Sequence, residues 1–177
     1  MDKFTEKTLS SKTVYNGRIF DITYDEIELA DGLKRHREII HHPGGVVIFA
    51  QKEDGNVLLV KQYRYATKSL QIELPAGRLE KGEDPLLAAK RELREETGYI
   101  AQNWKSLGYI FTTFGICDEK LYLFEAKDLT FDCQNTDEGE IIDYFELPLN
   151  EVRNLIKNGT INDAKTICAI SRAFLKL

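Results

Sequence analysis

Apolar and polar residues alternate over much of the chain, and this pattern predicts a protein built mainly from β-strands. The predicted strands cover residues 20–29, 33–42, 46–50, 57–62, 70–74, 104–112, 120–126 and 140–147. Two of the intervening turns carry a glycine, Gly32 and Gly55, which takes a positive φ without steric cost and favours a hairpin. Residues 1–12 are polar and show no alternation, so we expect them to be loose.

Helical spacing is limited to three later segments. These cover residues 84–98, 151–157 and 163–175. The first has clear ends, because Asp84 can cap it, Pro85 suits its first position and Gly98 suits its termination. Many strands with few helices, in an order that does not alternate, favour an α+β fold over a doubly wound α/β fold.

The first predicted helix has two distinct faces. Apolar residues within about 60° of one another, at about 100° per residue, form a stripe for burial: Leu86, Ala89 and Leu93. Another face carries Glu92, Glu95 and Glu96, which are related as i, i+3 and i+4. Two like charges about 4 Å apart repel by about 4 kcal/mol at an effective dielectric of about 20, so three carboxylates need a partner. Oxygen ligands of this kind suit Mg²⁺.

The alternative for this charged face is a solvated surface on which basic neighbours pair with the glutamates. Lys90, Arg91 and Arg94 are placed for such pairs. However, Gly77 and Glu83 precede the helix at fixed spacing, and a merely solvated face gives no reason for them. The pattern therefore favours a metal site.

Composition limits the classes of partner. The chain has 177 residues, enough for one ordinary domain, with 24 basic and 29 acidic residues and a net charge of −5. An acidic balance disfavours nucleic acid and anionic membranes as main partners. No apolar run approaches the roughly 20 residues that span a bilayer, and residues 1–12 lack the apolar core of a secretory signal. Three widely spaced cysteines without a ligand cluster predict reduced thiols and a cytoplasmic location.

Beyond these patterns, the chain resembles a known family. The residues that carry the resemblance are Gly77, Glu83, Arg91-Glu92-Leu93, Glu95-Glu96 and Gly98. They are similar to the Nudix box, GX5EX7REUXEEXGU, in which U is a bulky apolar residue, the last U being Tyr99 here. The resemblance implies the Nudix fold, a mixed β-sheet core sandwiched between helices. It also implies Mg²⁺-dependent hydrolysis of a nucleoside diphosphate linked to a further moiety, with Mn²⁺ as a substitute metal.

The resemblance also assigns roles within the box. The implied metal ligands are Glu92, Glu96, Glu95 and the backbone carbonyl of Ala76. Arg91 is expected to orient the glutamates, and Glu83 to support the loop before the helix. Arg91 and Glu95 are therefore also candidates for the catalytic machinery. The chemistry agrees, because a metal neutralises a pyrophosphate while a carboxylate orients or deprotonates the attacking water.

Sequence outside the box narrows the resemblance to one branch of the family. Residues 36–44, 62–64 and 73–77 resemble the ADP-ribose pyrophosphatase and nucleoside-diphosphate-sugar hydrolase branch. The resemblance implies that Arg37 and Arg64 contact the nucleotide and the diphosphate, for which a guanidinium has bidentate geometry, and the alternative is a surface salt bridge. Glu73 is a weaker candidate for recognising base or ribose, and a role at a sheet edge is equally open.

In this branch the catalytic base lies in a late loop. Residues 136–140 form the acidic loop in that position, and we favour Glu138 as the base, with Glu140 as the alternative and a solvated acidic turn as a third interpretation. An earlier loop carries Phe114 where the ADP-ribose enzymes have a marker proline, so the preferred sugar stays open. Phe114 either stacks on a base or sugar or simply packs, and Glu119 is a candidate for reaching the terminal ribose or a metal.

We expect an N-terminal antiparallel β extension at residues 1–42 and a Nudix domain at residues 43–177. In related enzymes such an extension packs against a second subunit, so the resemblance implies a homodimer. The predicted reaction converts ADP-ribose or a related nucleoside diphosphate sugar to a nucleoside monophosphate and a sugar phosphate. Rival substrates are GDP-mannose, dinucleoside polyphosphates and oxidised nucleotides. A rival class is a non-catalytic nucleotide-sugar sensor, against which the intact glutamates of the box argue.

Overall fold

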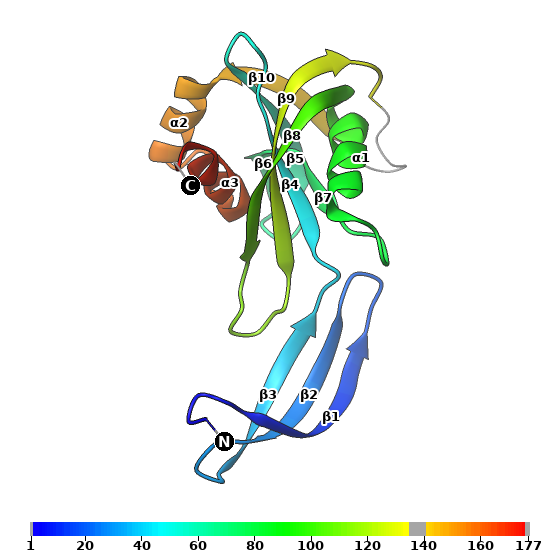
Figure 1. The fold of residues 1–177 in the computed structure, drawn as a ribbon, viewed down its shortest axis with the longest axis vertical. Helices are drawn as coiled ribbons and strands as arrows, with labels where there is room; N and C mark the ends of the chain where they lie inside the picture. The colour runs from blue at the N-terminus through cyan, green and yellow to red at the C-terminus, as the bar shows by residue number, and fades with distance from the viewer. Residues whose placement is uncertain (1, 135–140, 176–177) are drawn as a thin grey trace. The chain divides into compact units, whose positions relative to one another are not determined.

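The structure, a computed structural model, describes residues 2–134 and 141–175 (Figure 1). Its strands are β1 (Lys7–Asn16), β2 (Asp21–Glu28), β3 (Lys34–His41), β4 (Gly45–Ala50), β5 (Asn56–Arg64), β6 (Ser69–Glu73), β7 (Ala76–Arg78), β8 (Tyr99–Phe111), β9 (Lys120–Phe131) and β10 (Ile142–Pro148). Its helices are α1 (Pro85–Thr97), α2 (Leu149–Lys157) and α3 (Ala164–Phe174). All three predicted helices are present, and within the described ranges none is long and apolar enough to cross a membrane.

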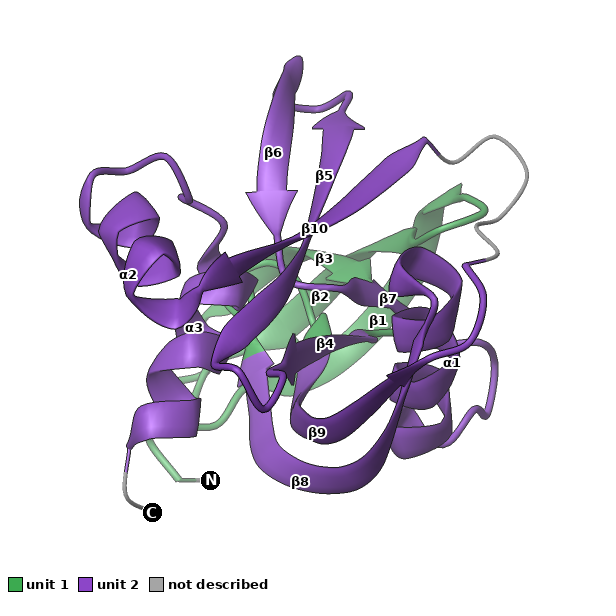
Figure 2. Ribbon diagram, turned by 90° about the horizontal axis from the view of Figure 1, so that it is seen from above, with its two compact units in different colours: residues 1–44, 111–120 green, residues 45–110, 121–177 purple. Residues whose placement is uncertain are grey.

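The chain divides into two compact units, which Figure 2 colours separately. The first contains residues 1–44 and 111–120 and is built on an antiparallel sheet in the order β1-β2-β3. The second contains residues 45–110 and 121–177. The expected antiparallel N-terminal sheet is confirmed, and the first unit also includes a segment that follows it much later in the chain.

A strand begins at Lys7, so the expectation that residues 1–12 are loose is wrong for residues 7–12. β1 pairs with β2 from Lys7, opposite Glu28, to Asn16, opposite Asp21. All ten residues of β1 are exposed, so neither face carries the apolar alternation by which a strand is recognised in sequence. Backbone pairing with β2, rather than burial of side chains, defines this strand.

The later segment joins the first unit through contacts with the end of β3. The Ile40 N–H donates to the Ile116 carbonyl at 2.8 Å, and the Asp118 N–H donates to the Ile40 carbonyl at 3.1 Å. The Asp118 carboxylate accepts from the His42 backbone N–H at 2.8 Å and binds the His41 ring at 2.7 Å. These bonds hold the connection between β8 and β9 within the first unit.

The second unit contains two sheets. One is mixed, in the order β7-β4-β9-β8, with β4 parallel to β9 and antiparallel to β7. The other is antiparallel, in the order β10-β5-β6. α1 lies on one side of these sheets, and α2 and α3 lie on the other (Figure 1). The expected α+β fold, a mixed sheet between helices, is therefore confirmed.

β4 serves both layers of the second unit. All six of its residues are buried. Val47 and Phe49 join the apolar core that includes α2 and α3, whereas Val46, Ile48 and Ala50 join the core that includes α1. Because successive side chains of a strand point to opposite faces, a strand buried on both sides requires an unbroken apolar run.

Candidate active site

α1 carries most of the predicted chemistry, and its sequence determines its ends. Asp84 Oδ1 accepts hydrogen bonds from two backbone N–H groups of the first turn, at 2.9 and 3.1 Å. Gly98 ends the helix in the left-handed region, at φ 76°. The predicted apolar stripe is confirmed, since Ala89 and Leu93 are fully buried and Leu86 is partly buried. This burial fixes which way the charged face of the helix points.

On the charged face, Arg91 binds three carboxylates, and we call Arg91, Glu83, Glu92 and Glu95 the Arg91 cluster. Arg91 Nε and Nη2 donate to the two oxygens of Glu83 at 3.0 and 3.1 Å. Arg91 Nη1 donates to Glu92 Oε1 at 2.7 Å and to Glu95 Oε2 at 2.9 Å. The hydrogen bonds from Arg91 hold the pKa of Glu83 below its ordinary value. The cluster thus has three carboxylates oriented by one guanidinium and an excess of negative charge.

The short strand β7 lies against two glutamates of α1. Glu96 is 4% exposed, and its Oε2 accepts a hydrogen bond from the Ala76 N–H at 2.9 Å. Gly77 approaches Glu92 so closely that a Cβ at position 77 would lie 1.9 Å from Glu92 Cδ. While Arg91 holds Glu92 in this place, only glycine fits at position 77.

The structure links the predicted metal-binding groups in two pairs, Glu92 with Glu95 through Arg91 and Glu96 with the Ala76 N–H. These groups are Glu92, Glu95 and Glu96 of α1 and the backbone at Ala76. The donor set is all oxygen, and together with the excess negative charge it fits a hard divalent cation. As arranged, residues 2–134 and 141–175 contain no group of three or more His, Cys, Asp or Glu side chains spaced to hold a metal. Arg91 occupies one oxygen each of Glu92 and Glu95 in this arrangement.

A second charged group lies at the end of β6. Glu73 is 2% exposed, and Arg64 binds both of its oxygens, with Nε–Oε1 at 2.7 Å and Nη2–Oε2 at 2.6 Å. Lys165 of α3 donates to the same Oε2 and pairs with Asp163 at 3.0 Å. Burial alone would raise the pKa of Glu73, but the hydrogen bonds from Arg64 and the charge of Lys165 outweigh burial and lower that pKa. Glu73 is therefore a buried, ionised carboxylate with two cationic partners.

This group also reaches the backbone just before the Nudix-like box. Asp163 caps α3, and its Oδ2 accepts from the Thr166 N–H at 3.0 Å and from Thr166 Oγ1 at 2.6 Å. Thr166 Oγ1 in turn accepts from the Leu74 N–H at 2.9 Å. We call Glu73, Arg64, Lys165, Asp163 and Thr166 the Glu73 network. Sequence reasoning missed its α3 members, because Lys165 and Thr166 lie 92 positions from their partners.

The remaining predicted substrate residues lie in the first unit. Arg37 of β3 binds both oxygens of Glu6, with Nε–Oε2 at 3.1 Å and Nη2–Oε1 at 2.5 Å. Phe114 is 85% exposed. Glu119 Oε2 accepts a hydrogen bond from Thr112 Oγ1 at 2.7 Å. The structure therefore places Arg37 in an ion pair and leaves the Phe114 ring open to solvent.

The two candidates for the catalytic base, Glu138 and Glu140, lie outside the described residues. Gln134 is the last described residue before them, and its Nε2 donates to the Glu96 carbonyl at 2.7 Å. The chain therefore leaves the described region from a residue that is bound to the end of α1.

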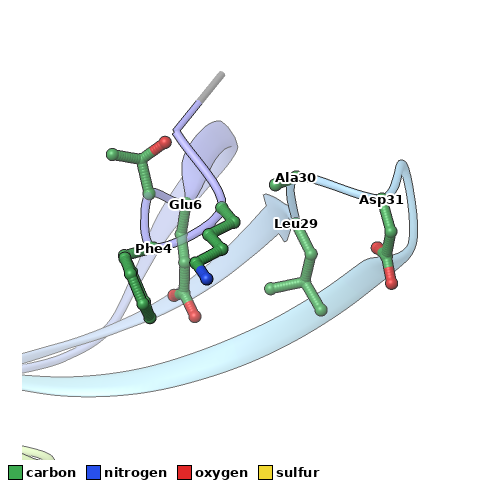
Figure 3. Close-up of a pocket in the computed structure, with 7 residues that line it drawn as sticks. Phe4, Glu6, Leu29, Ala30 and Asp31 are labelled. Atoms are coloured by element: carbon green, nitrogen blue, oxygen red, sulfur yellow. The ribbon is translucent and has the colours of Figure 1, made fainter.

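A hollow of about 660 Å³ on the first unit involves other residues (Figure 3). It is lined by Lys3, Phe4, Thr5, Glu6, Leu29, Ala30 and Asp31. None of the predicted site residues lines it, although Glu6, the partner of Arg37, does. The hollow is thus formed by different residues from those of the predicted chemistry.

Comparison with known proteins decides the family. The family model described as NUDIX domain matches residues 41–170, which is more than half of the chain. The chain belongs to the Nudix family. A second family model, described as Nucleoside diphosphate sugar hydrolase N-terminal domain, matches residues 6–40. Nudix hydrolases generally use divalent metal ions, which agrees with the all-oxygen donor set on α1.

Nudix relatives extend over nearly the whole chain. ADP-ribose pyrophosphatase from Bacillus subtilis (strain 168) is 35% identical over 178 residues, covering 99% of this chain and 96% of its own. Methanol dehydrogenase activator from Bacillus methanolicus is 39% identical over 169 residues, covering 94% and 91%. A crystal structure of an ADP compounds hydrolase has a TM-score of 0.84 and covers 96% of this chain and 92% of its own; at 24% identity it supports the fold. The chain is a Nudix enzyme, as its box implied.

Proposed function

We propose that this Nudix enzyme hydrolyses the pyrophosphate bond of ADP-ribose or a related nucleoside diphosphate sugar in a Mg²⁺-dependent reaction. The products are a nucleoside monophosphate and a sugar phosphate. The observation that carries the proposal is the excess of carboxylates around Arg91, beside the Ala76–Gly77 backbone. Similarity to a protein named ADP-ribose pyrophosphatase, over 96% of that protein's length, supports the substrate class.

The proposed reaction divides the work between metal and protein. The proposed ligands of Mg²⁺ are Glu92, Glu95, Glu96 and the carbonyl of Ala76. A Mg²⁺ ion held by these groups would neutralise the diphosphate and lower the pKa of a water, and Mn²⁺ is the expected substitute. Arg91 holds the carboxylates of Glu92 and Glu95 in fixed orientation. Gly77 leaves the space that the Glu92 carboxylate occupies.

We assign the general base to Glu138, with Glu140 as the alternative. The carboxylate takes a proton from the attacking water, and such bases contribute about 10²- to 10⁴-fold to rate. Glu138→Gln should therefore lose about 10²-fold or more in kcat, with Glu140→Gln close to wild type. The reverse result would move the base by two residues.

Substrate recognition is assigned to Arg37 and Arg64, with Glu73, Phe114 and Glu119 as further candidates. Both arginines hold a carboxylate through two donors. A diphosphate presents oxygens to the same fork of donors, so either guanidinium can exchange one anion for the other. The exposed ring of Phe114 suits stacking on a base or sugar.

A hydrolysis panel with Mg²⁺ tests the proposed function. The substrates are ADP-ribose, ADP-glucose, UDP-glucose, GDP-mannose, diadenosine polyphosphates and 8-oxo-dGTP, with products separated by chromatography. We expect the highest kcat/KM for ADP-ribose or another nucleoside diphosphate sugar. GDP-mannose is included because GDP-mannose pyrophosphatase from Cronobacter sakazakii is 29% identical over 169 residues. Turnover of none of them would contradict the proposal and favour a sensor.

We also propose that the enzyme is a homodimer that pairs through the β1-β2-β3 sheet. All residues of β1 are exposed, and its exposed apolar side chains include Leu9, Val14 and Tyr15. An edge strand with exposed apolar side chains favours association with another chain. The molar mass in solution tests this proposal, and a monomer at working concentrations would exclude it.

A second candidate function is activation of a methanol dehydrogenase. It is favoured by the 39% identity to Methanol dehydrogenase activator, which exceeds the 35% identity to the ADP-ribose pyrophosphatase. The test is the rate of methanol oxidation by a methanol dehydrogenase with and without this chain. An increase that is lost in Glu96→Gln would connect activation to hydrolysis, and no increase would exclude this candidate.

A further inference from the structure

Glu73 has two cationic partners, one of which, Lys165, it shares with Asp163. Arg64 binds both carboxylate oxygens at 2.7 and 2.6 Å, and Lys165 shares Oε2. The exposed fraction of the side chain is 3% for Glu73, 17% for Lys165 and 41% for Arg64. The lysine is thus largely enclosed with the carboxylate, whereas the arginine reaches solvent.

This difference matters for the role assigned to Arg64 under the proposed function. A guanidinium that binds a carboxylate through two donors cannot present those donors to a diphosphate at the same time. If Arg64 simply left, a buried carboxylate without a partner would remain, and burial strongly disfavours such a charge. Glu73 takes two of the five N–H donors of Arg64, so Arg64 can turn this whole fork to a diphosphate only if another group keeps Glu73 neutralised.

Lys165 meets this requirement. It binds Glu73 from α3, which follows Glu73 in the sequence, whereas Arg64 precedes it. The Lys165 Nζ also lies 3.0 Å from Asp163 Oδ2. Asp163 is itself fixed by capping α3 through Thr166. The lysine therefore has its own support, which does not depend on Arg64.

We propose that Lys165 is a positioning residue, which keeps Glu73 neutralised while Arg64 moves from Glu73 to the diphosphate of a bound nucleotide. The inference rests on the proposed function for the role of Arg64. Without ligand, Arg64 stays on Glu73. With ligand, the Arg64 donors bind phosphate oxygens, while Lys165 remains on Glu73 and touches no substrate.

The dissociation constant of ADP tests this independently of turnover. Calorimetric titrations in Mg²⁺ compare wild type, Lys165→Met, Lys165→Arg and the double variant Lys165→Met with Glu73→Gln. Lys165→Met should weaken ADP binding about 10-fold or more, the order expected for one lost charge-assisted contact. Lys165→Arg should bind like wild type. The double variant should recover most of the affinity, because the buried charge that retains Arg64 is gone.

A merely structural role for Lys165 predicts the opposite for the double variant. Two changes in the network would then bind ADP no better than Lys165→Met alone, and this result would overturn the proposal. Unchanged binding in Lys165→Met, or no binding of ADP by wild type, would overturn it as well. As a control, Arg64→Met should weaken ADP binding, and adding Lys165→Met to it should change little. Circular dichroism melting establishes that each variant is folded.

Turnover separates this inference from the proposed function. If wild type hydrolyses none of the panel substrates, the proposed function fails, and the ADP series still decides the role of Lys165. If wild type hydrolyses a nucleoside diphosphate sugar, Lys165→Met should raise KM by the factor found for ADP and change kcat by less than about twofold. A fall in kcat alone would contradict a role through Arg64.

Discussion

The Arg91 cluster and the Glu73 network both join carboxylates to cations, but the balance of charge differs between them. In the cluster, one guanidinium orients three carboxylates. In the network, one buried carboxylate binds a guanidinium and an ammonium. The cluster carries a net negative charge, which suits a divalent metal, whereas the network balances two carboxylates with two cations, one of which can turn to an anion. The proportion of charges, more than the residue types, indicates what each group binds.

Both groups are attached to the same short stretch of backbone. The Leu74 N–H donates to Thr166 of the network, and the Ala76 N–H donates to Glu96 beside the cluster. If the comparison is right, changes in the cluster should alter metal dependence, and changes in the network should alter stability and nucleotide binding. The following four substitutions test that division.

Glu96→Gln should have the largest effect. Glutamine keeps the size of the side chain and can still accept from the Ala76 N–H, but it removes charge from the proposed metal site. We expect kcat/KM at saturating Mg²⁺ to fall by about 10³-fold, beyond the about 10- to 100-fold of changes outside the ligands. Steady-state kinetics measure it, with the exposed Glu151→Gln of α2 as the control. Near-normal turnover would show that Glu96 is not a ligand of the metal, and the proposed metal site would be wrong.

Glu73→Gln should destabilise the fold by about 3 kcal/mol at neutral pH, the range for breaking a buried ion pair. The folded pKa of Glu73 is lowered from its ordinary value of 4.5, so its stabilisation is present above that pH and is lost as the pH falls through the lower folded pKa. Urea unfolding at several pH values should therefore find wild type and variant converging in acid. A difference that stays constant with pH would show that packing, not charge, is responsible.

Gly77→Ala should act on the cluster with little effect on stability. The added Cβ would meet the Glu92 carboxylate and displace it from Arg91. We expect a loss of about 10- to 100-fold in kcat/KM, as for other changes that misplace a ligand. The concentration of Mg²⁺ for half-maximal activity should rise. Gly115→Ala, with no atom within 4 Å of the added Cβ, is the matched control. If Gly77→Ala needed the same Mg²⁺ concentration as wild type for half-maximal activity, the proposed role of Glu92 as a metal ligand would be contradicted.

Asp84→Ala should have the smallest effect. It removes the cap of α1 and should cost about 1 kcal/mol of stability. Among the described residues the Asp84 carboxylate accepts from backbone N–H groups of the first turn, so we expect kcat/KM to stay near wild type. Thermal unfolding and kinetics on the same preparation measure both. A large loss of kcat/KM would show that the cap of α1 also positions Glu83.

The parts of the site that sequence predicted are local. Glu92, Glu95 and Glu96 lie within five residues, so helical spacing alone places them on one face, and Arg91 directly precedes them. The Glu73 network combines residues of β5, β6 and α3, and Arg37 is paired with a residue 31 positions away. Helical and strand periods carry no information about such distant pairs, which tertiary packing decides.

Strands could be predicted from the sequence where burial leaves an apolar pattern. β4 and β5 were predicted closely, because burial on one or both faces leaves an apolar pattern. β1 and β7 were missed, because β1 is exposed on both faces and the three residues of β7 include a glycine. β8 begins at Tyr99, five residues before the predicted start at Trp104. Backbone pairing forms these strands without an apolar signal.

The burial of β4 limits which parts of this enzyme can move. Val46 and Val47 pair with Gly77 and Ala76, so the backbone beside the carboxylates is attached to a strand buried on both faces. Amide protons in such a strand exchange with solvent only when much of the domain opens, whereas binding loops usually open locally. We therefore expect the backbone at Ala76 and Gly77, where the proposed metal site lies, to exchange among the slowest parts of the second unit. Adaptation to a ligand is left to side chains, which can exchange ion-pair partners above a backbone that stays in place.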